Sequence, residues 1–162
     1  MNVEPFTVDR VTMPNIQRKP VRSLGRMIDH TLSDKEQKEA LEEGIEDAIK
    51  KLDKSDLAGT MKVWGYQFML LATVSWKLMI YELPMSWVEG MERKINKWLR
   101  KWLGISKNIT DVALFCPETP CPLPLRSLVK EFKKTKVNAS IQLRQSQDEE
   151  VAKNYQLGSS KK

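Results

Sequence analysis

Hydrophobic residues recur at helical spacing along much of this 162-residue chain. After Ser33, leucine, isoleucine and alanine return every three or four positions with acidic residues between them, which predicts an amphipathic helix with an acidic solvent face. Residues 57–83 form the most apolar stretch and predict a buried central helix. Residues 86–104 and 125–145 predict two more helices, and Gly104 marks the end of the first because glycine readily takes the left-handed conformation.

The remaining segments lack this periodicity. Residues near the N-terminus mix valines with polar residues and prolines, which predicts a β-hairpin, and prolines crowd the segment near 110–123, which predicts a short extended stretch. The expected fold class is mainly α within an α+β fold, with an N-terminal β-hairpin followed by a thumb-like bundle of about four helices. We divide the chain into a hairpin unit at 1–32, a helical domain at 33–145 and a polar, disordered tail at 146–162.

The central apolar stretch is long enough to raise the question of a membrane span, which needs about 20 predominantly apolar residues. Polar side chains interrupt it at Lys62, Gln67 and Lys77, and its amphipathic neighbours need an apolar partner. The pattern therefore favours a buried helix and no membrane contact over an anchor formed by residues 63–81. The opening residues lack the basic start and apolar run of a signal peptide, so an intracellular protein, cytoplasmic or nuclear, is expected rather than a secreted one.

The net charge of +6 is concentrated in two of the predicted helices. Residues 85–108 hold six basic and two acidic side chains, and residues 125–145 hold six basic and one acidic. Placed at about 100° per residue, most cations of each helix fall on an arc opposite its apolar residues. These cations are Arg93, Lys94, Lys97, Arg100 and Lys101 in the first helix, and Arg126, Lys130, Lys133 and Lys134 in the second.

Helix faces with an excess of one charge sign favour contact with a polyanion, because lysine and arginine that meet phosphates release bound counterions. Such contacts position a duplex without reading its sequence. A solvated surface face is the alternative, as is a face that meets an acidic protein or a membrane surface.

Residue patterns for catalysis are lacking. The pair of aspartates that holds two metal ions for phosphoryl transfer is absent, and no glycine-rich phosphate loop or nucleophile motif occurs. The two cysteines, Cys116 and Cys121, and the single histidine, His30, do not make a zinc ligand set. We therefore expect no catalytic residue, no metal site and no cofactor in this chain.

Ordered runs of residues carry a family resemblance. They are Pro20–Arg26, Met61–Trp64 with Gln67 and Phe68, Trp76–Tyr81, Arg100–Gly104, Leu123–Leu125 and Lys130–Lys133. In this order and spacing they resemble reverse transcriptases of non-LTR retrotransposons, in the part that follows the catalytic strands. The resemblance extends to about Val151, and its specificity comes from the ordered set rather than from any single run.

In that family a leucine-glycine box on the primer-grip hairpin lies at the primer strand, and the resemblance assigns this role to Arg22, Ser23, Leu24 and Gly25. The helices that follow would form the thumb, whose basic faces close on an RNA or DNA template–primer duplex. The family's fingers and palm, with the aspartates that bind Mg²⁺, would lie upstream of Met1. The resemblance therefore implies the duplex and the missing fingers and palm as partners, and no polymerase activity for this chain alone.

Two functions follow as hypotheses. The first is a nucleic-acid-contacting fragment of a reverse transcriptase that lacks the catalytic carboxylates. The second is a structural or protein-interaction module, a domesticated retroelement remnant whose basic helices dock an acidic partner. Charge reversal of Lys97 and Arg100 would discriminate them, because only the first function predicts a loss of duplex binding.

Overall fold

A computed structural model describes residues 7–8, 11–12, 21–23, 26–28, 34–108, 110–115 and 125–159 of the chain. The helices are α1 (Lys35–Lys54), α2 (Gly59–Gly65), the π-helical segment η1 (Tyr66–Leu70), α3 (Leu71–Ile80), α4 (Met85–Leu103), α5 (Asp111–Phe115), α6 (Leu128–Arg144) and α7 (Glu149–Ser159). The strands are β1 (Thr7–Val8), β2 (Val11–Thr12), β3 (Val21–Ser23) and β4 (Arg26–Ile28).

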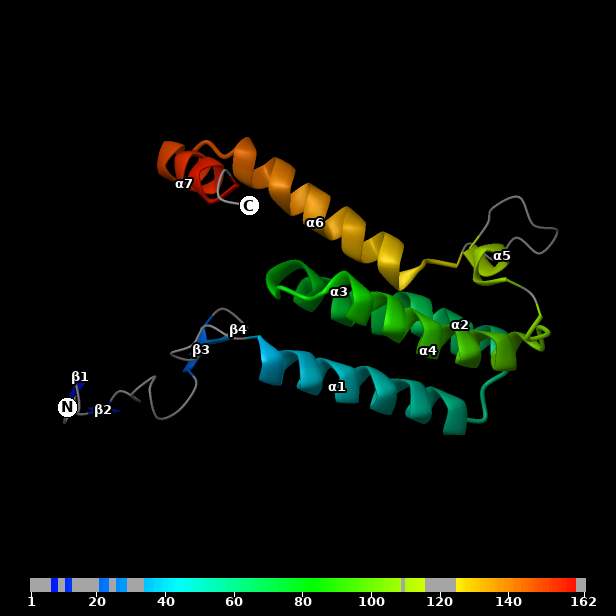
Figure 1. The fold of residues 1–162 in the computed structure, drawn as a ribbon. Helices are drawn as coiled ribbons and strands as arrows, with labels where there is room; N and C mark the ends of the chain where they lie inside the picture. Colours follow the sequence, from blue (N-terminus) through cyan, green and yellow to red (C-terminus); the bar gives the residue numbers. More distant parts are fainter. Residues whose placement is uncertain are drawn as a thin grey trace.

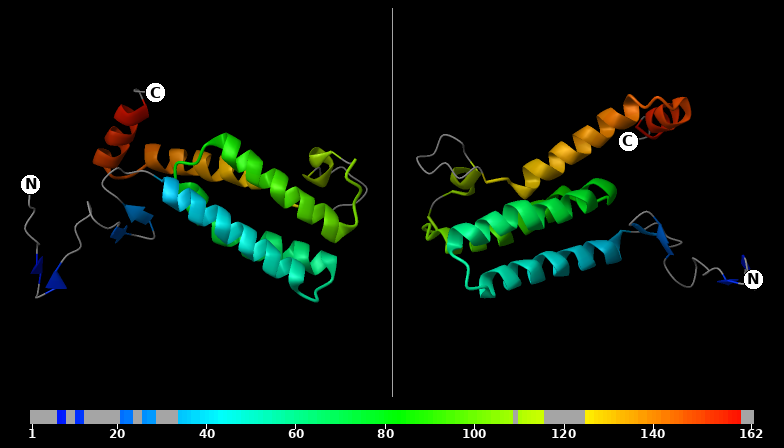
Figure 2. Two further views of the ribbon diagram at one scale, coloured as in Figure 1. Left: turned by 60° about the horizontal axis from the view of Figure 1, so that its bottom comes forward. Right: turned by 180° about the vertical axis from the view of Figure 1, so that it is seen from behind.

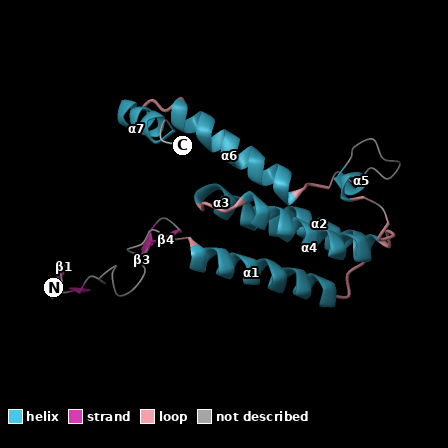
Figure 3. Ribbon diagram, in the orientation of Figure 1, coloured by secondary structure: helices cyan, strands magenta, loops and turns pink. Residues whose placement is uncertain are grey.

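The fold is all-α, and the predicted α+β class with an N-terminal hairpin as a structural unit is wrong. The strands are two or three residues long, and they pair only as the antiparallel ribbons β1–β2 and β3–β4. Isolated two-stranded ribbons of this length bury too little to be stable alone. Figure 3 shows them outside the bundle that the helices form. The described core is made by helices only.

The helices form three layers. In Figure 1, α1 lies on one side and α6 on the other, with α2, η1, α3 and α4 between them. The view from behind in Figure 2 shows the same order. In the middle layer α4 packs against α2, while α3 and α4 both pack against α6. The least exposed side chains of the shared core are Ile45, Tyr66, Leu78, Val88, Met91, Ile95, Leu99 and Leu128.

The central apolar segment forms one continuous helical rod, Gly59–Ile80, in which η1 makes a wider π turn. One side of the rod is buried, as expected, through Tyr66, Leu71 and Leu78. The opposite side is not buried, because Trp64, Phe68 and Trp76 are each more than half exposed. The prediction of a buried central helix is therefore correct for one face of the rod only.

Helix boundaries follow the sequence signals in part. The predicted end of the helix at Gly104 is confirmed, since this residue has φ 65° and lies in the left-handed region. Residues Asp111–Phe115, expected to be extended, form α5 instead, and residues 116–123 of that predicted stretch lie outside the described residues.

The segment expected to be a disordered tail contains α7. Its first turn is capped by Asp148, whose carboxylate accepts the backbone N–H groups of Glu150 and Val151. A hydrogen bond of 2.7 Å joins the hydroxyls of Ser140 and Tyr155, which ties α7 to α6. These local contacts stabilise a helix that the polar composition did not indicate.

Candidate nucleic-acid interface

Two lysines on the predicted basic face of α4 lie against the acidic face of α1. The Lys94 ammonium contacts Glu42 at 2.6 Å and Glu46 at 2.7 Å, and the Lys101 ammonium contacts Asp53 at 2.8 Å. The α1 face that was expected to be solvated is therefore partly an interface. These two lysines of α4 therefore form ion pairs within the fold.

Tryptophans of α4 complete the same contacts. The indole N–H of Trp87 donates to Glu42 at 2.9 Å, and that of Trp102 donates to Asp53 at 2.9 Å. Each carboxylate therefore receives one lysine and one indole from α4. A partly buried indole N–H needs a hydrogen-bond acceptor. Glu42 and Asp53 therefore accept the indole hydrogen bonds of α4 and also neutralise the charges of its lysines.

Arg100 is also paired. Its guanidinium donates to Asp111 of α5 at 2.5 Å, and its side chain is only 15% exposed. The expectation that five cations of α4 face outward as one unpaired surface therefore does not hold for Lys94, Arg100 and Lys101. Arg93 and Lys97 are exposed, and neither has an ion pair within the described part of the chain. The Arg93 Nε donates to the backbone carbonyl of Glu89 at 3.3 Å.

The contacts between α1 and α4 shift the pKa values of their partners. The hydrogen bond from Lys94, followed by that from Trp87, lowers the pKa of the Glu42 carboxyl. The hydrogen bonds from Lys101 and then Trp102 lower the pKa of Asp53. Glu42 and then Glu46 raise the pKa of Lys94 in return. Both carboxylates are thus favoured in their ionised form by the folded arrangement.

Glu42→Gln is expected to lower the free energy of unfolding at pH 7 and to have a smaller effect at pH 3. Because the folded-state pKa of Glu42 is depressed, its stabilising contribution is complete above the unfolded glutamate pKa of about 4.3 and is lost as the pH falls through the lower folded value. Urea unfolding of both proteins at the two pH values measures the difference. Glu43→Gln, at an exposed neighbouring position, is the control, and an equal effect of Glu42→Gln at both pH values would contradict the assignment.

The cations of α6, together with Arg126 just before it, are arranged differently. Arg126, Lys130, Lys133 and Lys134 are all exposed, and no ion pair to another described residue is formed by any of them. We call these four residues the α6 cation row. At about 1.5 Å per residue the three lysines extend over roughly 6 Å of α6, and Arg126 lies two residues before the first residue of the helix. Its opposite side packs into the core through Leu128 and Phe132.

Hydrogen bonds with α4 and with the rod hold the start of α6 in place. The Ser127 hydroxyl accepts the backbone N–H of Lys130 and donates to the Glu92 carboxylate at 2.5 Å. The same carboxylate oxygen accepts the backbone N–H of Val129 at 2.9 Å. From the rod, the buried Tyr66 hydroxyl donates to the carbonyl of Arg126 at 3.0 Å. Burial, assisted by the nearby negative charge of Glu92, raises the pKa of Tyr66, so the hydroxyl stays a donor.

Further along α6, Lys136 contacts the end of α3. The Lys136 ammonium donates to the carbonyls of Met79 and Tyr81, both at 2.8 Å, where α3 ends. A cation at this position complements the unpaired carbonyls of a helix C-terminus. Lys136 therefore anchors α6 to the rod, whereas the four residues of the α6 cation row remain at the surface.

The residues that the resemblance assigned to the primer grip are described only in part. Arg22 and Ser23 lie in β3, where they pair with Met27 and Arg26 of β4. Leu24 and Gly25 lie outside the described residues.

Sequence reasoning missed the carboxylates that neutralise α4. A signal for them exists, since Glu42, Glu46 and Asp53 share one face of α1 and Lys94 and Lys101 share one face of α4. Only the packing of α1 beside α4 selects these pairs.

No known protein family, curated protein or solved structure matches the chain. Among the described residues, none of the helices is both long enough and apolar enough to cross a membrane. The same part of the chain contains no group of three or more histidine, cysteine, aspartate or glutamate side chains placed to hold a metal ion.

Proposed function

We propose that this chain is a nucleic-acid-contacting fragment of a reverse transcriptase and that it binds the phosphate backbone of a template–primer duplex through α6. The observation that carries this proposal is the α6 cation row, in which three lysines at helical spacing and Arg126 just before the helix are exposed and have no ion pair within the described residues. The ordered sequence runs that resemble non-LTR reverse transcriptases support the choice of duplex.

The spacing of the row suits a nucleic-acid backbone. Double-stranded DNA carries one negative charge per about 1.7 Å of helix axis, so three lysines over roughly 6 Å of α6, with Arg126 before them, can face several phosphates at once. The buried residues on the opposite side of α6, and the anchoring by Glu92 and Tyr66, fix the backbone from which the four side chains extend. Contacts of this kind are independent of base sequence.

The proposal excludes three cations that sequence reasoning had included. Lys94, Arg100 and Lys101 have carboxylate partners inside the fold, so binding phosphate would require breaking those pairs. Reversing the charge of Arg100 would disturb α5 as well as any ligand. Arg93 and Lys97 remain exposed and are secondary candidates for duplex contact.

Neutralising the row in the triple variant Lys130→Gln, Lys133→Gln, Lys134→Gln is expected to weaken duplex binding about tenfold or more at low salt. Four phosphate contacts give a slope of about −3.6 for log K against log salt, and the variant loses about three units of that slope. Fluorescence anisotropy with a labelled RNA–DNA hybrid, across a salt series, measures both quantities. A second hybrid of unrelated sequence should bind with equal affinity.

A matched control removes the same charge elsewhere. Lys51→Gln, Lys54→Gln, Lys107→Gln also loses three exposed cations, all outside α6. If both triple variants weaken binding equally, net charge rather than the α6 cation row is responsible and the proposal fails. The proposal also fails if the affinity of the wild-type protein for the hybrid does not change across the salt series. Displacement of the hybrid by polyglutamate at equal charge would favour the alternative, an acidic protein partner.

A further inference from the structure

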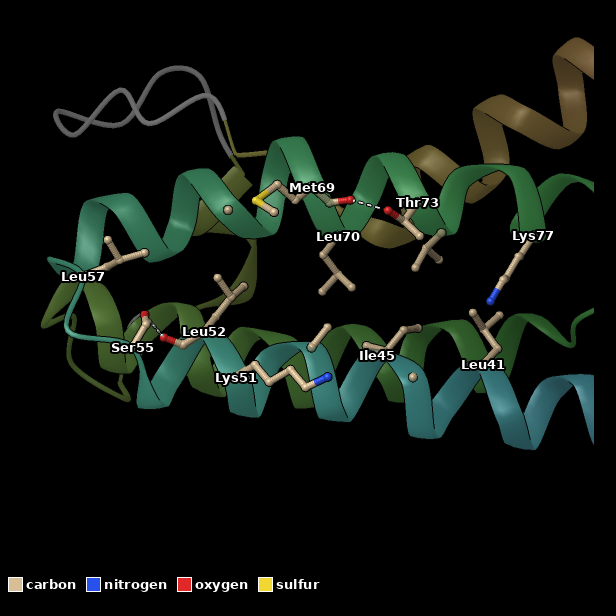
Figure 4. A pocket seen from close by; sticks show the side chains of 14 residues that line it. Leu41, Ile45, Lys51, Leu52, Ser55, Leu57, Met69, Leu70, Thr73 and Lys77 are labelled. Atoms are coloured by element: carbon tan, nitrogen blue, oxygen red, sulfur yellow. Dashed lines mark hydrogen bonds between the residues drawn. The ribbon is translucent and has the colours of Figure 1, made fainter.

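A groove opens on the side of the molecule where α1 faces the helical rod. It has a volume of about 500 Å³ and is lined mostly by aliphatic side chains from both walls. Figure 4 shows Leu41 and Lys77 at one end and Leu57 and Ser55 at the other. Leu52 and Leu70 project into the space between the walls. No hydrogen-bonding group other than those of Lys51, Ser55, Thr73 and Lys77 is offered by the lining side chains.

The rod continues this apolar surface beyond the groove. Met69 lines the groove and is 60% exposed, and beside it the rod exposes a row of large hydrophobic residues. They are Met61, Trp64, Phe68 and Trp76, and Leu57 just before the rod is exposed as well. The rings of Trp64 and Phe68 contact each other at 5.3 Å between centroids. Exposed surface with several aromatic residues and methionines is typical of protein interaction sites.

The α1 side of the groove has small residues at two positions. Gly44 and Ala48 line the groove one helical turn apart, and a Cβ at Gly44 would meet no atom within 4 Å. Glycine inside a helix costs about 0.5–1 kcal/mol relative to alanine. Because the space around Gly44 is open and its backbone is helical, nothing in the described fold requires glycine there. Its absence of a side chain leaves room for another backbone to approach α1.

The charges of the groove indicate the kind of partner. The two charged residues of its lining, Lys51 and Lys77, are both cations, and within the described residues neither forms an ion pair. In a symmetric dimer, a second copy of this chain would bring its own Lys51 and Lys77 to the same surface. An acidic partner complements the two lysines, whereas a second copy is disfavoured by like charge.

The dimensions indicate the partner's shape. From Leu41 to Ser55 the α1 wall extends over roughly 21 Å, at about 1.5 Å per residue. A volume of about 500 Å³ over that length is too narrow to enclose a helix of about 10–12 Å diameter. It is wide enough for one line of apolar side chains. The body of such a helix would then cover the exposed aromatic row beside the groove.

We propose that this groove docks an amphipathic helix of an acidic partner protein. Apolar residues of that helix, repeating every three or four positions over about four turns, enter the groove beside Gly44. Acidic residues that flank them reach Lys51 and Lys77. The groove lies between α1 and the rod, whereas the α6 cation row is on another helix, so this inference is independent of duplex binding.

The probe is a fluorescein-labelled 18-residue helical peptide with leucines at helical spacing and glutamates on its flanks. A matched peptide carries lysines in place of the glutamates. Wild-type protein is expected to bind the acidic peptide at least about tenfold more tightly than the basic one, measured by fluorescence anisotropy. Gly44→Phe, which fills the groove, should abolish binding. Gly90→Phe is the control, because Gly90 of α4 also has nothing within 4 Å of an added Cβ.

A second variant keeps the test independent of folding. Lys51→Glu with Lys77→Glu changes two exposed side chains and is expected to weaken binding of the acidic peptide about tenfold. Equal binding of both peptides, or equal loss with Gly44→Phe and Gly90→Phe, overturns the proposal. So does a wild-type dimer, seen by sedimentation, that Gly44→Phe dissociates, since the occupant would then be a second copy.

Discussion

Gly59→Ala is expected to lower the free energy of unfolding by about 3 kcal/mol, the upper end of the usual cost of overpacking. Gly59 is the first residue of α2, where the rod begins beside the last turn of α4. An added Cβ would lie well inside contact distance of the Trp102 carbonyl oxygen. That oxygen belongs to the backbone, so the clash can be relieved only by moving one helix away from the other.

Urea unfolding measures this change, with an unaltered dependence on denaturant as the sign that the folded state is otherwise retained. Gly44→Ala provides the opposite case in the same protein. It is expected to raise the free energy of unfolding by about 0.5–1 kcal/mol, because the site is helical and open. If Gly59→Ala does not lower the free energy of unfolding, α2 does not approach α4 as closely as described.

Glu92→Ala is expected to lower the free energy of unfolding by about 2–3 kcal/mol. The carboxylate accepts hydrogen bonds from Ser127 and from the backbone N–H of Val129, and hydrogen bonds to a charged group contribute about 1.5–3 kcal/mol each. The partial exposure of Glu92 reduces the sum. Loss of these bonds leaves the backbone N–H of Val129 without its acceptor and Ser127 without its partner, so amide hydrogen exchange should accelerate at the start of α6.

Glu89→Ala is the matched control, since Glu89 is an exposed glutamate one turn earlier on the same helix. Its removal should change stability by less than about 0.5 kcal/mol. If Glu92→Ala has an equally small effect, or if exchange rises throughout the bundle rather than at the start of α6, Glu92 is not the residue that anchors this helix.

Much of the helical architecture could be predicted from the sequence. Apolar residues at intervals of three and four located α1, the rod, α4 and α6, because one buried face is enough to give that pattern. The glycine at position 104 located the end of α4 for a local reason, its positive φ. Both signals arise within a single helix and do not depend on which helix is its neighbour.

The candidate site could be predicted only in part. The periodicity that places Lys94 and Lys101 on one face of α4 does not say that Glu42 and Asp53 lie opposite them, since that depends on packing. The same limit applies to the rod, whose aromatic row is as hydrophobic as a buried face and is nevertheless exposed. For α6 the prediction of a basic face required only that the opposite face be buried, as it is.

The charges between α1 and α4 also define the axial register of the two helices. Lys94 meets Glu42 and Glu46, and seven residues later Lys101 meets Asp53. Sliding α1 by one turn of about 5.4 Å in one direction would leave Lys94 between Glu42 and the like charge of Lys38, and would put Ile49 in place of Asp53 opposite Lys101. Sliding it the other way would carry Lys101 past the last residue of α1. Each of these ion pairs adds little to stability, but together they disfavour both alignments in which α1 is shifted by one turn along α4.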